Sequence, residues 1–138
     1  SDFGDKGNLP MPPGRRFAVL TCMDARLDPA KFAGLAEGDA HVIRNAGGRV
    51  SPDVLRSLAL ATHLLGVDRI CVVQHTRCRM VGTTNEEIRS TIGPAADGWD
   101  FLPIEDQERT LAADVEAVRQ MASDRAHAGC ADPVAVDF

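Results

Sequence analysis

Short, mostly apolar runs recur along the chain and predict β-strands, and the continuous run at 17–20 is expected to be covered on both faces. These runs lie at residues 16–21, 40–43, 69–74 and 133–136. Continuous apolar runs of this length are typical of parallel sheets, because helices cover both faces of such sheets. We therefore expect a central, mainly parallel sheet of about four strands.

Apolar residues spaced three and four apart predict the helices that flank this sheet. The clearest helix spans residues 52–65, with Ser51 as its cap, a proline at its first position and Gly66 directly after its end. Further helices are expected from Asp28-Pro29 onward, at residues 84–92 and at residues 105–127. Strands that alternate with helices indicate an α/β fold with right-handed crossovers.

The first fourteen residues differ from the rest of the chain. Residues 1–14 contain three glycines, three prolines and little periodicity, which predicts an extended arm that packs on a partner subunit. The 138-residue chain contains no evident linker and has the length of one domain. We therefore expect a single domain over residues 1–138 with an N-terminal arm.

Charge and composition make several classes of partner improbable. The formal net charge is −5, no basic run is present, and the aromatic residues are one Trp and five Phe. Nucleic acid is therefore a poor expectation as a partner, because both a basic track and a stacking surface are absent. Apolar runs far shorter than the roughly 20 residues of a membrane span, and the absence of a signal-peptide pattern, predict a cytoplasmic protein without membrane contact.

Reactive side chains follow two of the predicted strands. Cys22 comes directly after the first, and His75 and Cys78 follow the strand at 69–74. The carboxyl ends of parallel strands meet at one edge of a sheet, where ligands bind. Two thiolates and one imidazole suit Zn²⁺ and leave its fourth tetrahedral position open. The sequence therefore predicts a zinc site formed by these three residues.

The other two cysteines are expected to be unrelated to this site. Cys71 lies within an apolar run and is most simply explained as part of the core. Cys130 follows Gly129, and we expect it to lie in a turn with no functional role.

Asp24 and Arg26 lie two residues apart, directly after Cys22. On an extended segment their side chains project to the same side and can form a bidentate ion pair. Such a pair can be an ordinary surface contact. Alternatively, the guanidinium orients the carboxylate so that it accepts a hydrogen bond from zinc-bound hydroxide.

Four motifs, in order, resemble those of the β-class carbonic anhydrases, in particular the small bacterial and archaeal branch. They are Cys-Met-Asp-Ala-Arg-Leu-Asp at 22–28, Glu-Gly-Asp-Ala-His-Val-Ile-Arg-Asn-Ala-Gly-Gly at 37–48, Asp-Val-Leu-Arg-Ser-Leu at 53–58 and His-Thr-Arg-Cys at 75–78. The resemblance is specific from about residue 9 to residue 80 and only general beyond it.

This resemblance implies reversible hydration of carbon dioxide to bicarbonate by attack of zinc-bound hydroxide. It also implies a zinc held by Cys22, His75 and Cys78, a catalytic pair of Asp24 with Arg26, and a homodimer or higher homo-oligomer. In some members the aspartate becomes a fourth zinc ligand, so Asp24 is a conditional ligand by analogy. The turn at residues 46–48, Ala46, Gly47 and Gly48, would line the substrate pocket.

The chain departs from the family pattern around Cys78. Relatives usually have aspartate and glycine where this sequence has Arg77 and Arg79. Arg79 can point to solvent, bind an anion such as bicarbonate near the zinc, or block the pocket. A change near the zinc keeps open the hydrolysis of carbonyl sulfide or carbon disulfide. Arg79 also leaves open a catalytically silent, zinc-stabilised subunit or binding partner. A thiol redox protein that uses Cys22 and Cys78 is a further alternative.

Overall fold

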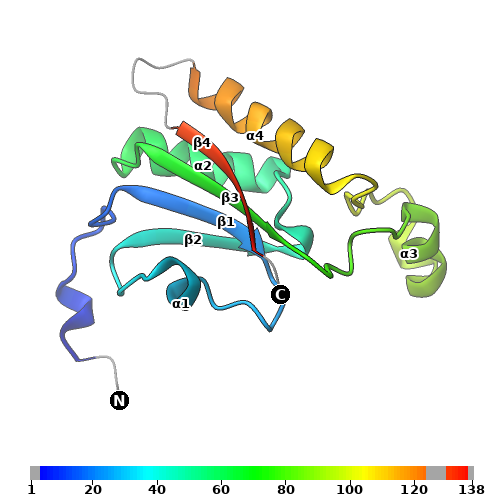
Figure 1. Ribbon diagram of the computed structural model, residues 1–138, viewed down its shortest axis with the longest axis horizontal. Helices are drawn as coiled ribbons and strands as arrows, with labels where there is room; N and C mark the ends of the chain where they lie inside the picture. Colours follow the sequence, from blue (N-terminus) through cyan, green and yellow to red (C-terminus); the bar gives the residue numbers. More distant parts are fainter. Residues whose placement is uncertain (1–3, 124–129, 137–138) are drawn as a thin grey trace.

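The computed structural model describes residues 4–123 and 130–136, with side chains through residue 122. Its centre is a four-stranded sheet in the order β2-β1-β3-β4 (Figure 1). The strands are β1 Phe17–Cys22, β2 Ala40–Asn45, β3 Arg69–His75 and β4 Cys130–Val136. All three neighbouring pairs are parallel. The predicted α/β class with a parallel sheet flanked by helices is confirmed.

Four α-helices occur in the described residues. They are α1 Pro29–Ala33, α2 Pro52–Leu64, α3 Asn85–Ile92 and α4 Gln107–Ser123. Helices α2 and α4 pack on one face of the sheet. Short 3₁₀ segments occupy η1 Gly4–Asn8, η2 Ala46–Gly48 and η3 Pro94–Ala96. As predicted, Ser51 caps α2: its hydroxyl accepts a hydrogen bond from the Val54 N–H at 3.3 Å, and Pro52 occupies the first helical position.

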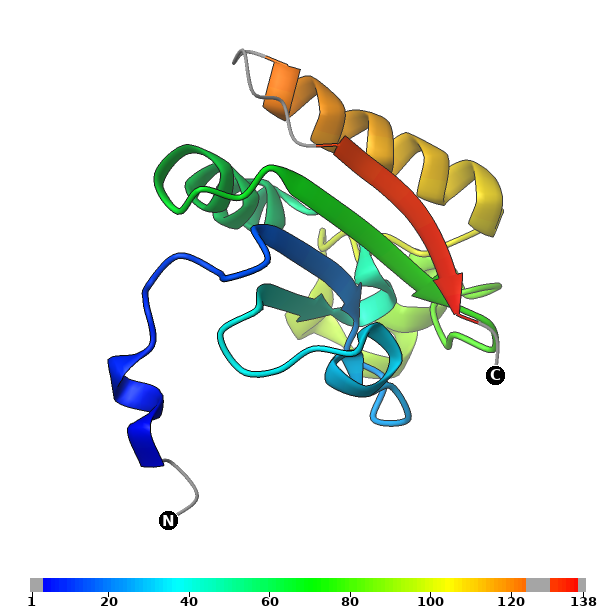
Figure 2. The ribbon, with the colours of Figure 1, turned by 60° about the vertical axis from the view of Figure 1, so that its left-hand side comes forward.

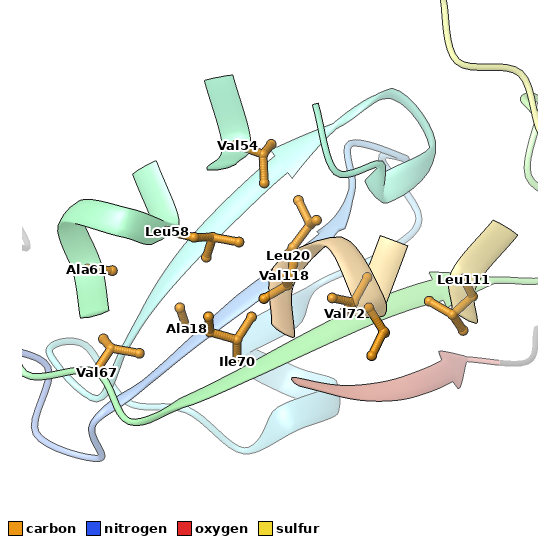
Figure 3. Close-up of a cluster of buried hydrophobic side chains, with 11 residues drawn as sticks. Ala18, Leu20, Val54, Leu58, Ala61, Val67, Ile70, Val72, Leu111 and Val118 are labelled. Atoms are coloured by element: carbon orange, nitrogen blue, oxygen red, sulfur yellow. The ribbon is translucent and has the colours of Figure 1, made fainter. Parts of the chain in front are cut away.

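The main core lies between the sheet and the pair α2 and α4 (Figure 3). Ala18, Leu20, Ile70 and Val72 alternate along β1 and β3, so they share one face of the sheet. Side chains of both helices pack on that face, including the fully buried Leu58 of α2. Burial of one such side chain contributes about 1.5–3 kcal/mol, so this core fixes the strands whose ends carry the predicted ligands.

The N-terminal segment and α3 lie at opposite ends of the molecule (Figure 1). A second view shows the N-terminal segment extending beyond the edge of the sheet (Figure 2). The expected arm contains the 3₁₀ helix η1, so it is not extended throughout. It is held near the body by a 2.8 Å ion pair from Lys6 to Glu37 and by a 2.7 Å hydrogen bond from Gly14 N–H to the Gly38 carbonyl.

Two other sequence expectations, one on helix α4 and one on Cys71, need correction. Helix α4 begins at Gln107 and not at residue 105, because the Asp106 carboxylate accepts a hydrogen bond from the Arg109 N–H at 3.1 Å and caps the helix there. The expected end at residue 127 lies outside the described residues. Cys71 is half-buried and not part of the main core.

Strand β4 is longer than predicted and begins at Cys130, which therefore lies in a strand and not in a turn. The proline at 133 pairs with Val72 in the parallel ladder. Proline is tolerated here because β4 is the edge strand of the sheet.

Among the described helices, none has the length and apolar character needed to cross a bilayer.

Candidate metal centre

The structure brings the three predicted ligands together. Cys22 ends β1, His75 ends β3, and Cys78 lies in the turn that follows. One potential ligand atom from each residue lies within 4.8 Å of the others. All three residues are buried, with exposures of 5%, 1% and 7%. Two sulfur atoms and one imidazole nitrogen at this spacing form a group able to hold a metal ion.

The tautomer of His75 is set by its backbone contact. Its Nδ1 lies 2.7 Å from the Thr76 carbonyl oxygen, which can only accept a hydrogen bond, so Nδ1 carries the proton. The lone pair is then on Nε2, as metal ligation requires. The Gln107 side-chain amide at the start of α4 donates to the His75 carbonyl at 2.9 Å and ties this strand end to the helix.

Asp24 forms the predicted two-point contact with Arg26. The Arg26 Nε and Nη2 atoms donate to the two carboxylate oxygens at 3.0 and 2.6 Å, and the Arg26 backbone N–H donates at 2.9 Å. These bonds, the side-chain one foremost, hold the pKa of Asp24 well below its usual range. The carboxylate Oδ2 also lies 3.7 Å from His75 Nε2. An ionised acceptor therefore stands directly beside the metal-binding group.

Arg44 holds the loop that carries Asp24. Its guanidinium donates to the Cys22 and Asp24 carbonyls at 3.0 and 2.8 Å and to the Leu27 carbonyl at 3.3 Å. Three hydrogen bonds from one rigid guanidinium fix the path of the backbone between the potential ligand Cys22 and the buried Leu27. Sequence reasoning did not assign this role, because it depends on contacts between β2 and a loop about twenty residues away.

The glycine turn after β2 contacts the metal-binding group through its backbone. The Gly47 N–H points at the Cys22 sulfur, 3.3 Å away. Gly48 has φ 62°, and a Cβ there would lie 3.1 Å from the Cys22 nitrogen and 3.2 Å from the Val73 carbonyl oxygen. A larger residue at 48 would collide with the sheet backbone. Ala46, the third predicted pocket residue, is exposed.

Arg77 and Arg79 are both exposed. Arg77 has φ 55°, whereas Arg79 is not among the described residues with positive φ. The left-handed backbone position in this turn is therefore residue 77, and an arginine at 79 does not require it. The Arg77 carbonyl accepts a hydrogen bond from Arg26 Nη2 at 3.1 Å, so the turn also helps to hold the Asp24–Arg26 pair.

Arg79 lines a cavity of about 190 Å³ that faces α3, together with Met80, Thr83 and residues of that helix. None of the three potential metal ligands lines this cavity. Met80 separates the two regions, because it packs against the cluster of Cys22, Leu27 and Cys78. Of the three orientations left open for Arg79, the exposed side chain is consistent with the one toward solvent.

The electrostatics of the cysteine pair favour a cation. Burial raises the pKa of the Cys78 thiol, and the nearby Cys22 raises it further. The buried Cys78 thiol therefore does not ionise readily without a compensating positive charge, whereas a bound metal would supply that charge and displace the proton. The donor set of two sulfurs and one imidazole nitrogen thus fits a soft or borderline metal ion.

Comparison with known proteins gives the family. The carbonic anhydrase family profile matches residues 17–131. β-Carbonic anhydrase 1 of Mycobacterium tuberculosis is 49% identical over 89 residues, which cover 64% of this chain and 55% of that protein. The chain belongs to the β-class carbonic anhydrase family. The family resemblance seen in the four sequence motifs is thereby confirmed.

This β-class carbonic anhydrase homologue is also similar to a solved carbonic anhydrase and to a carbon disulfide hydrolase. The solved carbonic anhydrase from Glaciozyma antarctica has a TM-score of 0.85 and 36% identity, covering 99% of this chain and 84% of that chain. A carbon disulfide hydrolase from Acidianus is 46% identical over 78 residues, or 56% of this chain and 38% of that protein. The matches thus span about half or less of these curated relatives.

Proposed function

We propose that this protein is a zinc enzyme that catalyses the reversible hydration of carbon dioxide to bicarbonate. The observation that carries the proposal is the Asp24 carboxylate, held by Arg26 at 3.0 and 2.6 Å beside the group of Cys22, His75 and Cys78. Three such ligands suit zinc and leave the fourth tetrahedral position for water or substrate, which is the arrangement of a catalytic site.

Zinc bound by these residues would lower the pKa of water toward about 7 and so supply a nucleophile near neutral pH. Asp24 then acts as an acceptor. Its depressed pKa keeps it ionised, so it accepts a hydrogen bond from the attacking water but does not store the released proton near pH 7. Accepting that bond turns a lone pair of the water oxygen toward the carbon of carbon dioxide.

Arg26 has a second task in this proposal. By analogy with the family, Asp24 is a conditional metal ligand, and its Oδ2 lies 3.7 Å from His75 Nε2. The two side-chain bonds from Arg26 and the one from its backbone hold the carboxylate away from the metal. Loss of the hydrogen bonds from Arg26 would therefore let Asp24 take the fourth metal position and close the site to substrate.

The turn at residues 46–48 borders the proposed substrate space. Gly47 matters there because a Cβ would meet Met80 and the Arg49 side chain at 3.3 Å. Gly48 contributes by letting the turn approach the β1 backbone, and Ala46 forms the exposed rim. A small apolar molecule such as carbon dioxide needs little more than such a smooth wall.

We further propose that the chain works as a single domain in a homodimer or larger homo-oligomer, with the arm at 1–14 packed on a partner subunit. Met11 in the arm is 79% exposed and Leu9 is 45% exposed, so the arm offers apolar surface to such a partner. A reducing cytoplasm is the proposed location, since it keeps thiol ligands available for metal.

Stopped-flow hydration of carbon dioxide by the zinc-loaded protein tests this proposal. Turnover above the buffer background is expected between about pH 7 and 9, where the activated water ionises. Asp24→Ala should retain zinc but lose about 100-fold or more in turnover, as expected when a preorganised polar group is removed. Equal zinc loss in Asp24→Ala and Cys78→Ser would instead make Asp24 a structural ligand. Background-level turnover in zinc-loaded wild type would refute hydration.

Hydrolysis of carbon disulfide or carbonyl sulfide is the second candidate. It is favoured by the 46% identity to a carbon disulfide hydrolase over 78 residues. Release of hydrogen sulfide from carbon disulfide, measured beside carbon dioxide hydration on the same preparation, distinguishes the two. Faster turnover of carbon disulfide would replace the leading proposal.

The catalytically silent and redox alternatives have less support. The silent alternative relied on Arg79, which lines the cavity toward α3. The redox alternative would leave His75 without a role, although it lies within 4.8 Å of both cysteines. Stoichiometric zinc in the purified protein, measured by elemental analysis, argues against a redox dithiol.

A further inference from the structure

The N–H of Gly47 is aimed at the Cys22 sulfur by a turn that is itself closed by Asn45. The Asn45 amide nitrogen donates to the Arg49 carbonyl at 2.8 Å, and its oxygen accepts from the Arg49 N–H at 2.8 Å. This two-way bridge spans residues 46–48. The direction of the Gly47 N–H therefore depends on where residue 49 is held.

The Arg49 side chain is held by a buried acidic partner on α4. Its Nε and Nη2 atoms donate to the two carboxylate oxygens of Asp114 at 2.7 and 3.3 Å, and its Nη1 donates to the Leu102 carbonyl at 2.6 Å and to the Pro103 carbonyl at 3.4 Å. Asp114 also accepts a hydrogen bond from the Val50 N–H at 3.1 Å.

This ion pair is unlike the surface pairs of the chain. The side chains of Arg49 and Asp114 are only 13% and 9% exposed, whereas both partners of the pair between Asp53 and Arg56 are more than two-thirds exposed. The two-point geometry makes the contact directional. Its low exposure makes it costly to break, because the remaining charge would be left buried and unpaired. Together with the bond from the Val50 N–H to Asp114, the ion pair anchors residues 49 and 50 to the helix α4.

We propose that Arg49 and Asp114 are positioning residues for the metal site. They fix the turn at 46–48 so that the Gly47 N–H stays on the Cys22 sulfur. The inference rests on metal binding in the proposed function. Neither residue belongs to the group of three potential ligands, so both act through the turn and not through contact with the metal.

The expected effect follows from what a hydrogen bond does to a thiolate ligand. The N–H withdraws electron density from sulfur, so the sulfur donates less charge to the metal and the metal becomes a stronger Lewis acid. The same contact holds the sulfur in position before the metal arrives. Loss of an outer contact of this kind typically costs 10–100-fold in metal affinity.

Binding of Co²⁺ in place of zinc tests the proposal, because the Co²⁺–thiolate charge-transfer band in the near ultraviolet reports the electron density on sulfur. Asp114→Asn should bind Co²⁺ about tenfold or more weakly in competition with a chelator, with a displaced band. Arg49→Met should behave in the same way, and Arg49→Lys should recover part of the loss. The double variant should lose no more than either single variant, since both act through one turn.

Val118→Ala is the matched control. Val118 lies on the same helix, is fully buried and belongs to the main core, so its truncation destabilises α4 without touching Arg49. It should leave the Co²⁺ affinity and the band unchanged. Wild-type affinity and band in Asp114→Asn and Arg49→Met, or an equal change in Val118→Ala, would overturn the positioning role alone. Absence of a thiolate band in wild type would overturn both this role and the proposed function.

Discussion

The carboxyl edge of β1 and β3 and the segment at residues 81–104 are built on different principles. At the sheet edge, Cys22, His75 and Cys78 are each at most 7% exposed. In the other segment, helix α3 has no buried residue at all. The sheet edge is fixed by burial and by hydrogen bonds from distant elements, whereas α3 is fixed by polar contacts close to it in sequence. The group able to hold a metal ion is thus located on the well-packed part of the molecule.

The contacts around α3 are numerous but exposed. Thr84 caps the helix by accepting from the Glu87 N–H at 3.1 Å, and the Asn85 amide donates to Asp100 at 2.9 Å. Arg89 donates to the Trp99 carbonyl from two nitrogens at 2.9 and 2.6 Å. Each such exposed contact contributes little, so the segment should open more easily than the sheet.

Removing a ligand should give the largest effect. Cys78→Ser is expected to lower metal affinity by more than about 100-fold, a larger loss than outer contacts produce, and to abolish the rise in melting temperature on adding metal. Elemental analysis and thermal unfolding with and without zinc measure both. Cys71→Ser is the control, because Cys71 lies on β3, the strand that leads to Cys78, but outside the metal-binding group. Equal zinc content in the two variants would mean that Cys78 is not a ligand.

Truncation of apolar side chains should give the next largest effect, because the loss in free energy of unfolding should differ between the core beneath the sheet edge and α3. Leu58→Ala in α2 removes a fully buried side chain and should lower the free energy of unfolding by about 2–5 kcal/mol. Ile92→Ala in α3 removes one that is 53% exposed, and a change within about 0.5 kcal/mol is expected. Urea denaturation of both variants measures the difference. A cost for Ile92→Ala close to that of Leu58→Ala would show that a partner or another element covers α3.

Loss of the α3 cap should have a smaller and local effect. Thr84→Ala removes the acceptor for the Glu87 N–H and should cost about 1 kcal/mol. Since α3 makes few contacts with the core, hydrogen exchange should accelerate in residues 85–92 and stay unchanged in β1 and β3. Faster exchange in the strands would indicate that α3 and the sheet unfold together.

The smallest effect should depend on pH. Hydrogen bonds from Asn85 and from the Leu102 N–H lower the pKa of Asp100. A group whose pKa is depressed by folding stabilises the protein above its unfolded pKa and loses that contribution as pH falls through its folded pKa. The stability gap between wild type and Asp100→Asn should therefore be constant from pH 5 to 7 and shrink below about pH 4. Denaturant unfolding across this range tests it; a gap that widens toward acid pH would contradict it.

The sequence predicted the sheet edge well because its signals are local. Unbroken apolar runs marked the strands that end at Cys22 and His75, and parallel pairing brings such ends together without further information. The i, i+2 spacing of Asp24 and Arg26 was enough to predict their ion pair. Strand β4 was predicted too short, because the proline at 133 reads as an interruption unless the strand is known to lie at an edge.

Contacts between distant elements left no comparable signal. Arg49 and Asp114 are separated by 65 positions, and neither belongs to a local pattern that indicates a buried ion pair. The role of Arg44 likewise depends on the path of the loop after Cys22. For Arg79 the sequence left three orientations open, because the direction of a side chain in this turn depends on the position of α3, which local sequence does not predict.

A crystal structure of the zinc-loaded protein with anomalous data at the zinc edge tests the central claim most directly. The account predicts one strong peak at bonding distance from the Cys22 and Cys78 sulfurs, about 2.3 Å, and from His75 Nε2, about 2.0–2.1 Å. Asp24 should remain paired with Arg26, as in the present structure. A peak elsewhere, or a zinc ligated by Asp24 with Arg26 turned away at neutral pH, would contradict it.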